Sequence, residues 1–299
     1  MITLATKEMM PQLKKMWQIC FQDEMSYVDF YYDNRFKEEN TYVYKKGEEI
    51  LGMLTLLPAS YRYTDDETLP IHYVYAVATL PKARNQGIAS DLLEEASRTS
   101  EEKYSAGTIL VPASKELFSY YERRGYQTIY FKKQLYFKVA AEQMLSVASI
   151  KAENVRVHEV SLAYERNYEK MDILPEEYKQ LRDFYFDRPG YVKWNLEAIT
   201  YAVKEARFAG GKVLKLSVDS HSYSIMYYKK NNQLVMKETT LPEDLIADAI
   251  AYLMKEEECM EAIVTVPSYY AFEGELLPYA MVRLNTEAYA NGYFNLALD

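Results

Sequence analysis

The sequence has little of what a membrane or secreted protein needs. Its longest apolar stretch, ILGMLTLLPA at residues 50–59, is too short to cross a bilayer, and MITLATKEMM lacks the basic region and apolar core of a signal peptide. Cysteine is scarce: Cys20 and Cys259 lie far apart, and no CxxC pair occurs. We therefore expect a soluble cytoplasmic protein with two buried free thiols, no metal site and no membrane partner.

Positive charge is also in short supply. The 35 basic residues are outnumbered by 44 acidic ones, and the formal net charge is −9. Nucleic acid requires a basic surface, so a nucleic-acid partner is not expected. An acidic chain favours a cationic partner instead, although many cytosolic proteins are mildly acidic.

The remaining composition describes a globular protein. Hydrophobic residues make up 49% and charged residues 26% of the 299, which is enough for one large domain or two ordinary ones. The first half alternates strands and helices, with helices expected at about 7–21 and 86–102. The segment QTIYFKKQLYFKV, residues 127–139, is expected to close this domain as a pair of strands.

The second half repeats the order of the first. TILVPASKELFSYYERRGY and AIVTVPSYYAFEGELLPYA occupy the same place in each half, and a helix is again expected before the second of them, at about 242–257. Between the halves, AEQMLSVASIKAEN is small and polar. We therefore expect a divergent duplication with domains at 1–145 and 146–299.

One short segment of the first half has the features of an anion site. In VATLPKARNQGIASDLLEEA, residues 77–96, a strand ends, the chain turns, and a helix begins at Gln86 or Gly87. The first turn of a helix leaves backbone N–H groups without partners, and its dipole adds positive charge. Gly87 lets an anion approach the backbone, and Arg84 supplies a cation with bidentate geometry. This pattern predicts a phosphate site, whereas the alternative is a helix start that uses glycine only for packing.

The segment is neither GxxxxGK[ST] nor GxGxxG, so it indicates no nucleotide-hydrolase or dinucleotide site. It resembles the [QR]xxGx[GA] signature of the GNAT superfamily of acyl-CoA-dependent N-acyltransferases. This resemblance implies two α/β GNAT-like domains, each a mixed, mostly antiparallel sheet flanked by helices, with acetyl-CoA as the acyl donor of the first. The residues that it assigns to the donor are Val77, Ala78 and Thr79 on the strand and Arg84, Asn85, Gln86, Gly87, Ile88, Ala89 and Ser90 at the helix start.

The resemblance also implies a catalytic tyrosine. The family places a tyrosine beside the thioester sulfur, four residues before a glycine, and YERRGY makes this residue Tyr121, with Tyr120 as its competitor. A tyrosine hydroxyl within hydrogen-bond reach can protonate the leaving thiolate. Ser114 departs from the family, since many relatives have an asparagine there that touches the donor.

The general base is the open point of this assignment. Where some relatives carry a carboxylate, this chain has Tyr73, with His72 beside it. Histidine titrates near the required pH, but a lone histidine is more often structural. Asp23, Glu24 and Asp29, in the region that usually walls the acceptor site, are alternatives, and so is a base that acts through ordered water.

The second copy of the segment, ETTLPEDLIADAIAYLM at residues 238–254, has neither arginine nor glycine before its helix. Glu243 and Asp244 put negative charge there instead, which would repel a phosphate. We therefore expect a degenerate second domain. Tandem domains of this kind resemble the "enhanced intracellular survival" group of acetyltransferases, but the third domain of that group is not expected in a chain that ends at Asp299.

The expected function is transfer of an acetyl group from acetyl-CoA to a primary amine of a small molecule or peptide, by direct attack on the thioester. The alternative is a non-catalytic acyl-CoA-binding scaffold, which the missing carboxylate at Tyr73 would favour. Whether the chain forms a homodimer stays open. In DFYFDRPGYVKW, the residues Arg188, Tyr191 and Trp194 either pack around a prolyl break or line an aromatic wall.

Overall fold

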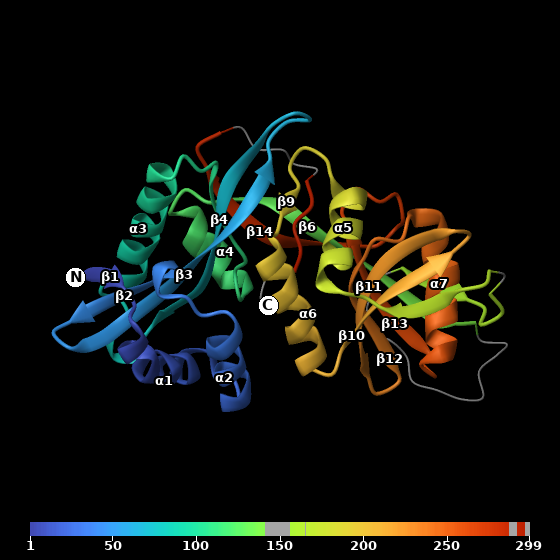
Figure 1. Ribbon diagram of the computed structural model, residues 1–299, viewed down its shortest axis with the longest axis horizontal. Helices are drawn as coiled ribbons and strands as arrows, with labels where there is room; N and C mark the ends of the chain where they lie inside the picture. Colours follow the sequence, from blue (N-terminus) through green and yellow to red (C-terminus); the bar gives the residue numbers. More distant parts are fainter. Residues whose placement is uncertain (141–155, 165, 287–291, 297–299) are drawn as a thin grey trace. The chain divides into compact units, whose positions relative to one another are not determined.

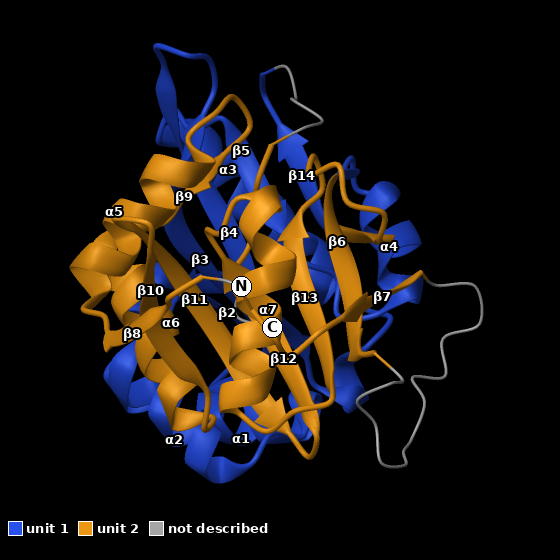
Figure 2. Ribbon diagram, turned by 90° about the vertical axis from the view of Figure 1, so that its right-hand side faces the viewer, with its two compact units in different colours: residues 1–129, 280–289, 298–299 blue, residues 130–279, 290–297 orange. Residues whose placement is uncertain are grey.

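In the computed structural model, the chain folds into two compact units (Figure 2). Unit 1 consists of Met1–Ile129, Ala280–Tyr289 and Leu298–Asp299, and unit 2 of Tyr130–Tyr279 and Ala290–Ala297. The structure describes residues 1–140, 156–164, 166–286 and 292–296. The boundary expected at 145/146 lies outside the described residues, and unit 2 begins earlier, at Tyr130.

Unit 1 is a mixed sheet with helices on both faces (Figure 1). Its strands are β1 (Ile2–Leu4), β2 (Thr41–Lys46), β3 (Glu49–Arg62), β4 (Thr68–Thr79) and β5 (Gly107–Leu110). Its helices are α1 (Met10–Phe21), α2 (Met25–Asn34), α3 (Ile88–Glu102) and α4 (Lys115–Glu122), with short 3-10 turns at Lys7–Met9, Glu38–Asn40 and Pro81–Ala83. The strands from β1 to β4 pair antiparallel in sequence order, and β5 joins β4 in parallel.

The two faces of this sheet follow from the alternation of side chains along β4. Val74 packs into a cluster with Leu92 of α3 and Tyr121 of α4. Its neighbour Tyr75 points the other way, and its ring centroid lies 5.8 Å from that of Trp17 on α1. Therefore α3 and α4 cover one face of the sheet, and α1 and α2 cover the other.

Helix α3 is held to the sheet by one apolar stripe. Ile88, Leu92, Leu93 and Ala96 are buried at helical spacing. Burial of an aliphatic side chain of this size contributes about 2 kcal/mol, so the stripe fixes both the position and the rotation of the helix. Its amino end is thereby placed beside the carboxyl end of β4.

Unit 2 repeats this arrangement. Its strands are β6 (Gln127–Val139, from Tyr130 on), β7 (Val157–Val160), β8 (Glu169–Asp172), β9 (Val192–Lys193), β10 (Lys212–Val218), β11 (His221–Lys230), β12 (Gln233–Thr239) and β13 (Glu261–Pro267). Its helices are α5 (Pro175–Phe186), α6 (Leu196–Phe208) and α7 (Glu243–Glu256). As in unit 1, an antiparallel run of strands, β10 to β12, is followed by a helix and a strand parallel to its last member. The expected mixed, mostly antiparallel α/β fold is confirmed.

Each unit receives one strand from the other half of the sequence. In unit 1, residues Met281–Leu284 of β14 (Glu275–Leu284) pair antiparallel with β5, and in unit 2, residues Lys132–Lys138 of β6 pair antiparallel with β13. The expectation that residues 127–139 form a strand pair is wrong. They form a single strand because Leu135, Phe137 and Val139 alternate to one face and are fully buried in the core of unit 2.

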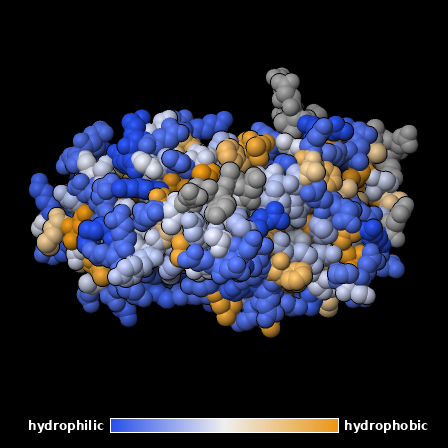
Figure 3. Space-filling model, turned by 90° about the horizontal axis from the view of Figure 1, so that it is seen from above, coloured by the Kyte–Doolittle hydropathy of each residue, from blue (hydrophilic) through white to orange (hydrophobic). Residues whose placement is uncertain are grey.

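None of the described helices is both long and apolar enough to span a bilayer. On the face of the molecule shown in Figure 3, hydrophilic residues predominate and apolar ones gather in small separate groups.

Candidate active site

The predicted donor-binding strand contains a β-bulge. The register of β3 with β4 passes from Thr55 opposite Tyr75 to Met53 opposite Ala78, so Ala76 and Val77 together face Leu54. Ala76 has a φ of 50°, in the left-handed region that a non-glycine residue adopts at such an irregularity. Bulges redirect the strand that carries them, and this one lies where the strand approaches α3.

The parallel pairing of β4 with β5 is short. It covers His72 opposite Thr108 and Tyr73 opposite Ile109, and beyond Tyr73 the register of β4 is with β3. Within the described residues, no strand pairs with Val77, Ala78 and Thr79 on the side of β4 away from β3, and these are the strand residues that the sequence analysis assigns to the donor.

The turn between β4 and α3 exposes a row of backbone donors. Asn85 and Gly87 have left-handed φ values of 62° and 82°, and a Cβ added to Gly87 would meet no atom within 4 Å. The first helical hydrogen bond runs from the amide of Asp91 to the carbonyl of Gly87, at 3.0 Å. Among the described residues, none accepts a hydrogen bond from the amides of residues 85–90. These amides and the helix dipole form an anion cradle.

Arg84 and Thr79 border this cradle. Arg84 is exposed, its Nε lies 3.4 Å from the carbonyl oxygen of Thr79, and no carboxylate of the described residues pairs with it. The Thr79 hydroxyl oxygen is buried and has no hydrogen-bond partner within the described part of the chain. An unpaired buried polar atom costs stability unless a ligand or water satisfies it, so this group fits a donor-binding role.

Cys20 approaches the same corner from α1. Its thiol lies 3.5 Å from the Thr79 carbonyl oxygen and is only half-buried, whereas Cys259 is buried as expected. Burial raises the pKa of the Cys20 thiol, and the neighbouring Arg84 opposes this shift. The thiol therefore stays protonated at neutral pH.

Tyr121 lies in the same core cluster as Ile88, the first residue of α3. Its side chain is buried, and its hydroxyl has no hydrogen bond to any described residue. Burial raises the pKa of this hydroxyl well above the ordinary value, with smaller contributions from Tyr126 and Tyr120. The Tyr126 hydroxyl, by contrast, is paired with that of Thr108 at 2.9 Å. Tyr121 thus brings a protonated, unengaged hydroxyl into the cluster behind the cradle.

Ser114 lies at the start of α4. It is exposed, and its side chain hydrogen-bonds Glu116, lowering the pKa of that carboxyl.

Arg124 is a neighbour of the cradle that was not expected from the sequence. Its Nε and Nη2 donate to the Ser90 hydroxyl oxygen at 3.1 and 2.7 Å, and its Nη1 donates to the Tyr120 carbonyl at 2.7 Å. The guanidinium also lies 3.5 Å from the centre of the Tyr120 ring. The second arginine of YERRGY was the available signal, but the contact with Ser90 spans 34 residues of sequence.

His72 and Tyr73 lie on opposite faces of β4. His72 Nδ1 lies 3.1 Å from the hydroxyl of Ser100 on α3 and 3.3 Å from that of Ser105. Burial, and secondarily Lys103, lowers the pKa of His72 to about 4. Tyr73 is buried on the α1 face and stacks on Tyr75 at 5.9 Å between centroids. The structure therefore does not bring the two candidate bases together.

The acidic alternatives are mostly engaged. Asp23 accepts a hydrogen bond from the Trp17 indole at 2.7 Å, and Asp29 pairs with Lys14 at 2.7 Å. Glu24 is exposed at the start of α2. Within the described residues, no group of three His, Cys, Asp or Glu side chains is placed to hold a metal ion.

The described residues of unit 2 form no counterpart of the cradle. β12 also bulges, so that Met226 pairs with Glu238 in the register that Met53 and Ala78 occupy in unit 1. Where unit 1 has a small alanine, Glu238 is fully buried and pairs with Arg182 at 3.1 Å. It also accepts hydrogen bonds from Tyr178 and Tyr293. A buried network of charged and aromatic side chains therefore lies at the position where unit 1 has Ala78.

The start of α7 is closed to anions. Three residues separate β12 from α7, compared with eight between β4 and α3, and Glu243 and Asp244 stand in the first turn. A Glu243 carboxylate oxygen accepts a hydrogen bond from the amide of Ala271 at 2.8 Å. The predicted loss of the anion site is consistent with this arrangement.

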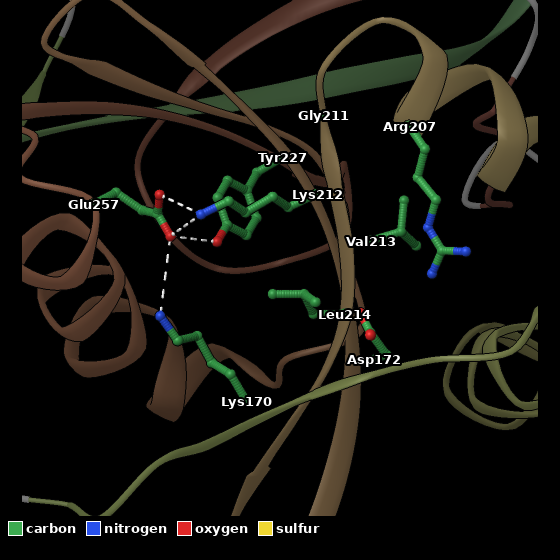
Figure 4. A pocket seen from close by; sticks show the side chains of 9 residues that line it. All are labelled: Lys170, Asp172, Arg207, Gly211, Lys212, Val213, Leu214, Tyr227 and Glu257. Atoms are coloured by element: carbon green, nitrogen blue, oxygen red, sulfur yellow. Dashed lines mark hydrogen bonds and ion pairs between the residues drawn. The ribbon is translucent and has the colours of Figure 1, made fainter.

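A cavity of about 400 Å³ lies in unit 2, and none of the predicted site residues lines it (Figure 4). Its charges are largely paired: the Glu257 carboxylate accepts from Lys212 at 2.7 and 2.8 Å and from Tyr227 at 2.8 Å, and Lys170 lies 3.9 Å away.

Comparison with known proteins agrees with this geometry. Residues 1–129, less than half of the chain, match the family described as acetyltransferase (GNAT) domain. No curated protein matches the chain. This family transfers acyl groups from acyl-CoA, so the match supports acyltransferase activity in unit 1.

Solved structures share the fold of almost the whole chain. A probable N-acyltransferase of Enterococcus faecalis has 14% identity and a TM-score of 0.68, over 95% of this chain and 72% of its own. A GCN5-related N-acetyltransferase of Anabaena variabilis has 14% identity and a TM-score of 0.70, over 95% and 72%. Eis1 of Mycobacterium abscessus has 9% identity and a TM-score of 0.67, over 95% and 73%. At such identities the likeness shows the fold alone.

Proposed function

We propose that this protein transfers the acetyl group of acetyl-CoA to a primary amine of a small molecule or peptide. The observation that carries the proposal is the anion cradle at residues 85–90, with Arg84 at its rim and the unengaged Tyr121 hydroxyl in the cluster behind it. The cradle suits the pyrophosphate of the donor, and the edge of β4 from Val77 to Thr79 suits its amide-bearing arm.

For this acyl transfer the protein has to hold the amine and the thioester together and stabilise the leaving thiolate. An unprotonated amine attacks the thioester carbonyl, a C–N bond forms, and the C–S bond breaks with the electron pair leaving on sulfur. Tyr121 donates a hydrogen bond to that sulfur. Because its pKa is raised, Tyr121 is a weaker acid than the coenzyme A thiol, so it keeps its proton and stabilises the developing thiolate through the hydrogen bond. The attacking amine loses its proton to water, and the thiolate is protonated from water.

No protein base is assigned in this proposal. His72 is buried against α3 with a pKa of about 4, and Asp23 and Asp29 have partners. In this proposal the proton of the acceptor amine leaves through water, and the exposed Glu24 is the alternative base. The acidic limb of the rate profile should follow the pKa of the acceptor itself, and we expect it to move when acceptors of different basicity are compared.

The test is release of free coenzyme A from acetyl-CoA across a panel of small-molecule and peptide amines, together with calorimetric titration of acetyl-CoA. We expect binding and amine-dependent thiol release. Binding without release by any amine would favour the scaffold alternative, and absence of binding would contradict both.

A further inference from the structure

Arg124 is held in place by three hydrogen-bonding N–H groups and a ring. Two of the N–H groups point to the Ser90 hydroxyl oxygen, one to the Tyr120 carbonyl, and the guanidinium covers the Tyr120 ring. The side chain is half-buried. These contacts hold the guanidinium in one orientation, whereas an arginine that contacts only solvent would sample many.

The surroundings of Arg124 carry unbalanced positive charge, which favours binding of an anion. Ser90 is the third residue of α3, so the Arg124 guanidinium lies at the positive end of the helix dipole. Arg84 stands in the turn that leads to the same helix, with its Nε 3.4 Å from the Thr79 carbonyl oxygen. Within the described residues, no carboxylate pairs with either arginine. Two cations at a helix amino end are mutually unfavourable, and a bound anion relieves the repulsion.

The contacts with Arg124 determine whether the Ser90 hydroxyl donates or accepts a hydrogen bond on its free side. A serine hydroxyl has two lone pairs and one hydrogen. Both N–H groups of Arg124 approach the oxygen, at 3.1 and 2.7 Å, and so occupy its acceptor capacity. The Ser90 hydrogen must point elsewhere. The amide of Ser90 is also without a helical acceptor, so both of its donors serve the amino end of α3.

We propose that Arg124 is a positioning residue that makes the Ser90 hydroxyl an obligate hydrogen-bond donor to the pyrophosphate of the acyl donor. This inference rests on the proposed function. Arg124 acts through Ser90, so the effects of the two residues on donor binding should be coupled.

The experiment is a double-mutant cycle by calorimetric titration of acetyl-CoA into Ser90→Ala, Arg124→Met and the double variant. We expect each single change to weaken binding about 10-fold or more, the value of a hydrogen bond to a charged group, and the double variant to be no weaker than Arg124→Met. Arg123→Met is the matched control, because Arg123 is an exposed neighbour of the same charge; its dissociation constant should stay within about twofold of the wild type.

A second readout separates positioning from general damage. With S-acetyl-pantetheine, which has the thioester arm but no pyrophosphate, turnover of both single variants should match the wild type. If Arg124→Met unfolds, Arg124→Lys, which keeps the charge but loses the two-pronged contact, replaces it and should weaken acetyl-CoA binding as well.

Unchanged acetyl-CoA affinity in Ser90→Ala or Arg124→Met, or a double variant whose loss is the product of the single losses, overturns this inference and leaves the proposed function standing. Equal losses with acetyl-pantetheine also overturn it. A wild-type protein that does not bind acetyl-CoA overturns both.

Discussion

Tyr121 is the residue on which the proposed chemistry depends most. Its hydroxyl has no hydrogen-bond partner among the described residues, whereas the hydroxyl of the neighbouring Tyr126 is hydrogen-bonded to that of Thr108. The spacing of Tyr121 to Gly125 could be recognised in the sequence. The raised pKa of Tyr121 could not be predicted, because it is caused by burial among residues that are distant in sequence.

Tyr121→Phe removes the hydroxyl and keeps the ring, so stability and acetyl-CoA affinity should hardly change. Turnover should fall about 100-fold, at the lower end of the range for loss of one hydrogen-bond donor to a developing anion, because the thiolate is a fairly good leaving group. The reactive form is the protonated phenol, and its pKa is raised, so we expect no Tyr121-dependent decline of the wild-type rate below pH 10. Steady-state thiol release against pH checks both points. Tyr120→Phe is the control, and unchanged turnover of Tyr121→Phe when chemistry limits the rate removes Tyr121 from the mechanism.

His72 is expected to make the stability of the fold depend on pH. Its pKa is about 4 in the folded protein and near 6.5 when unfolded, so below pH 6.5 the unfolded chain binds the extra proton. The folded state therefore loses stability as the pH falls from 6.5 to 4, by about 3 kcal/mol. Urea unfolding should show this loss in the wild type and not in His72→Gln. An identical pH dependence of the two proteins would contradict the assignment.

At the scale of elements, periodic helices were predictable and irregular features were not. The helices expected at 86–102 and 242–257 are α3 at Ile88–Glu102 and α7 at Glu243–Glu256, because an apolar stripe marks each of them. The helix expected at 7–21 opens with a 3-10 turn at Lys7–Met9. The bulge at Ala76 carries no glycine or proline signal, and the Arg124–Ser90 contact joins two helices that the sequence cannot orient.

Gly87 determines the start of α3 through its backbone. With a φ of 82° and open space around it, Gly87→Val should cost about 1–3 kcal/mol of stability from strain, and the added side chain should also obstruct the cradle. Gly47→Val is a matched control, since Gly47 has a φ of 61°, equally open surroundings and a place in the β2–β3 turn. Both variants should melt earlier, and only Gly87→Val should lose acetyl-CoA affinity. Equal affinities would make the glycine purely structural.

At the scale of the whole molecule, the exchange of strands ties the two halves of the sequence together. Met281 is fully buried in the core of unit 1, and residues up to Leu284 cover the edge of β5. No local pattern predicts this, because pairing partners about 170 residues apart cannot be read from alternation alone.

A fragment of residues 1–145 lacks those strand residues and should therefore neither unfold cooperatively nor bind acetyl-CoA alone. Mixing it with residues 146–299 should restore binding. Circular dichroism melts and calorimetry of the fragment, the mixture and the intact chain check this expectation. A fragment that binds acetyl-CoA as tightly as the intact chain would show that the exchanged strand is dispensable.

The most direct test of the central claim, a single acyl-CoA site at the start of α3, is calorimetric titration of acetyl-CoA into the wild type and Arg84→Ala. We predict one site per chain, because Glu238 and Glu243 close the counterpart in unit 2. Loss of the arginine should weaken binding by about 1.5–3 kcal/mol, or roughly 10- to 150-fold. Two equivalent sites, or an unchanged dissociation constant in Arg84→Ala, would contradict the account.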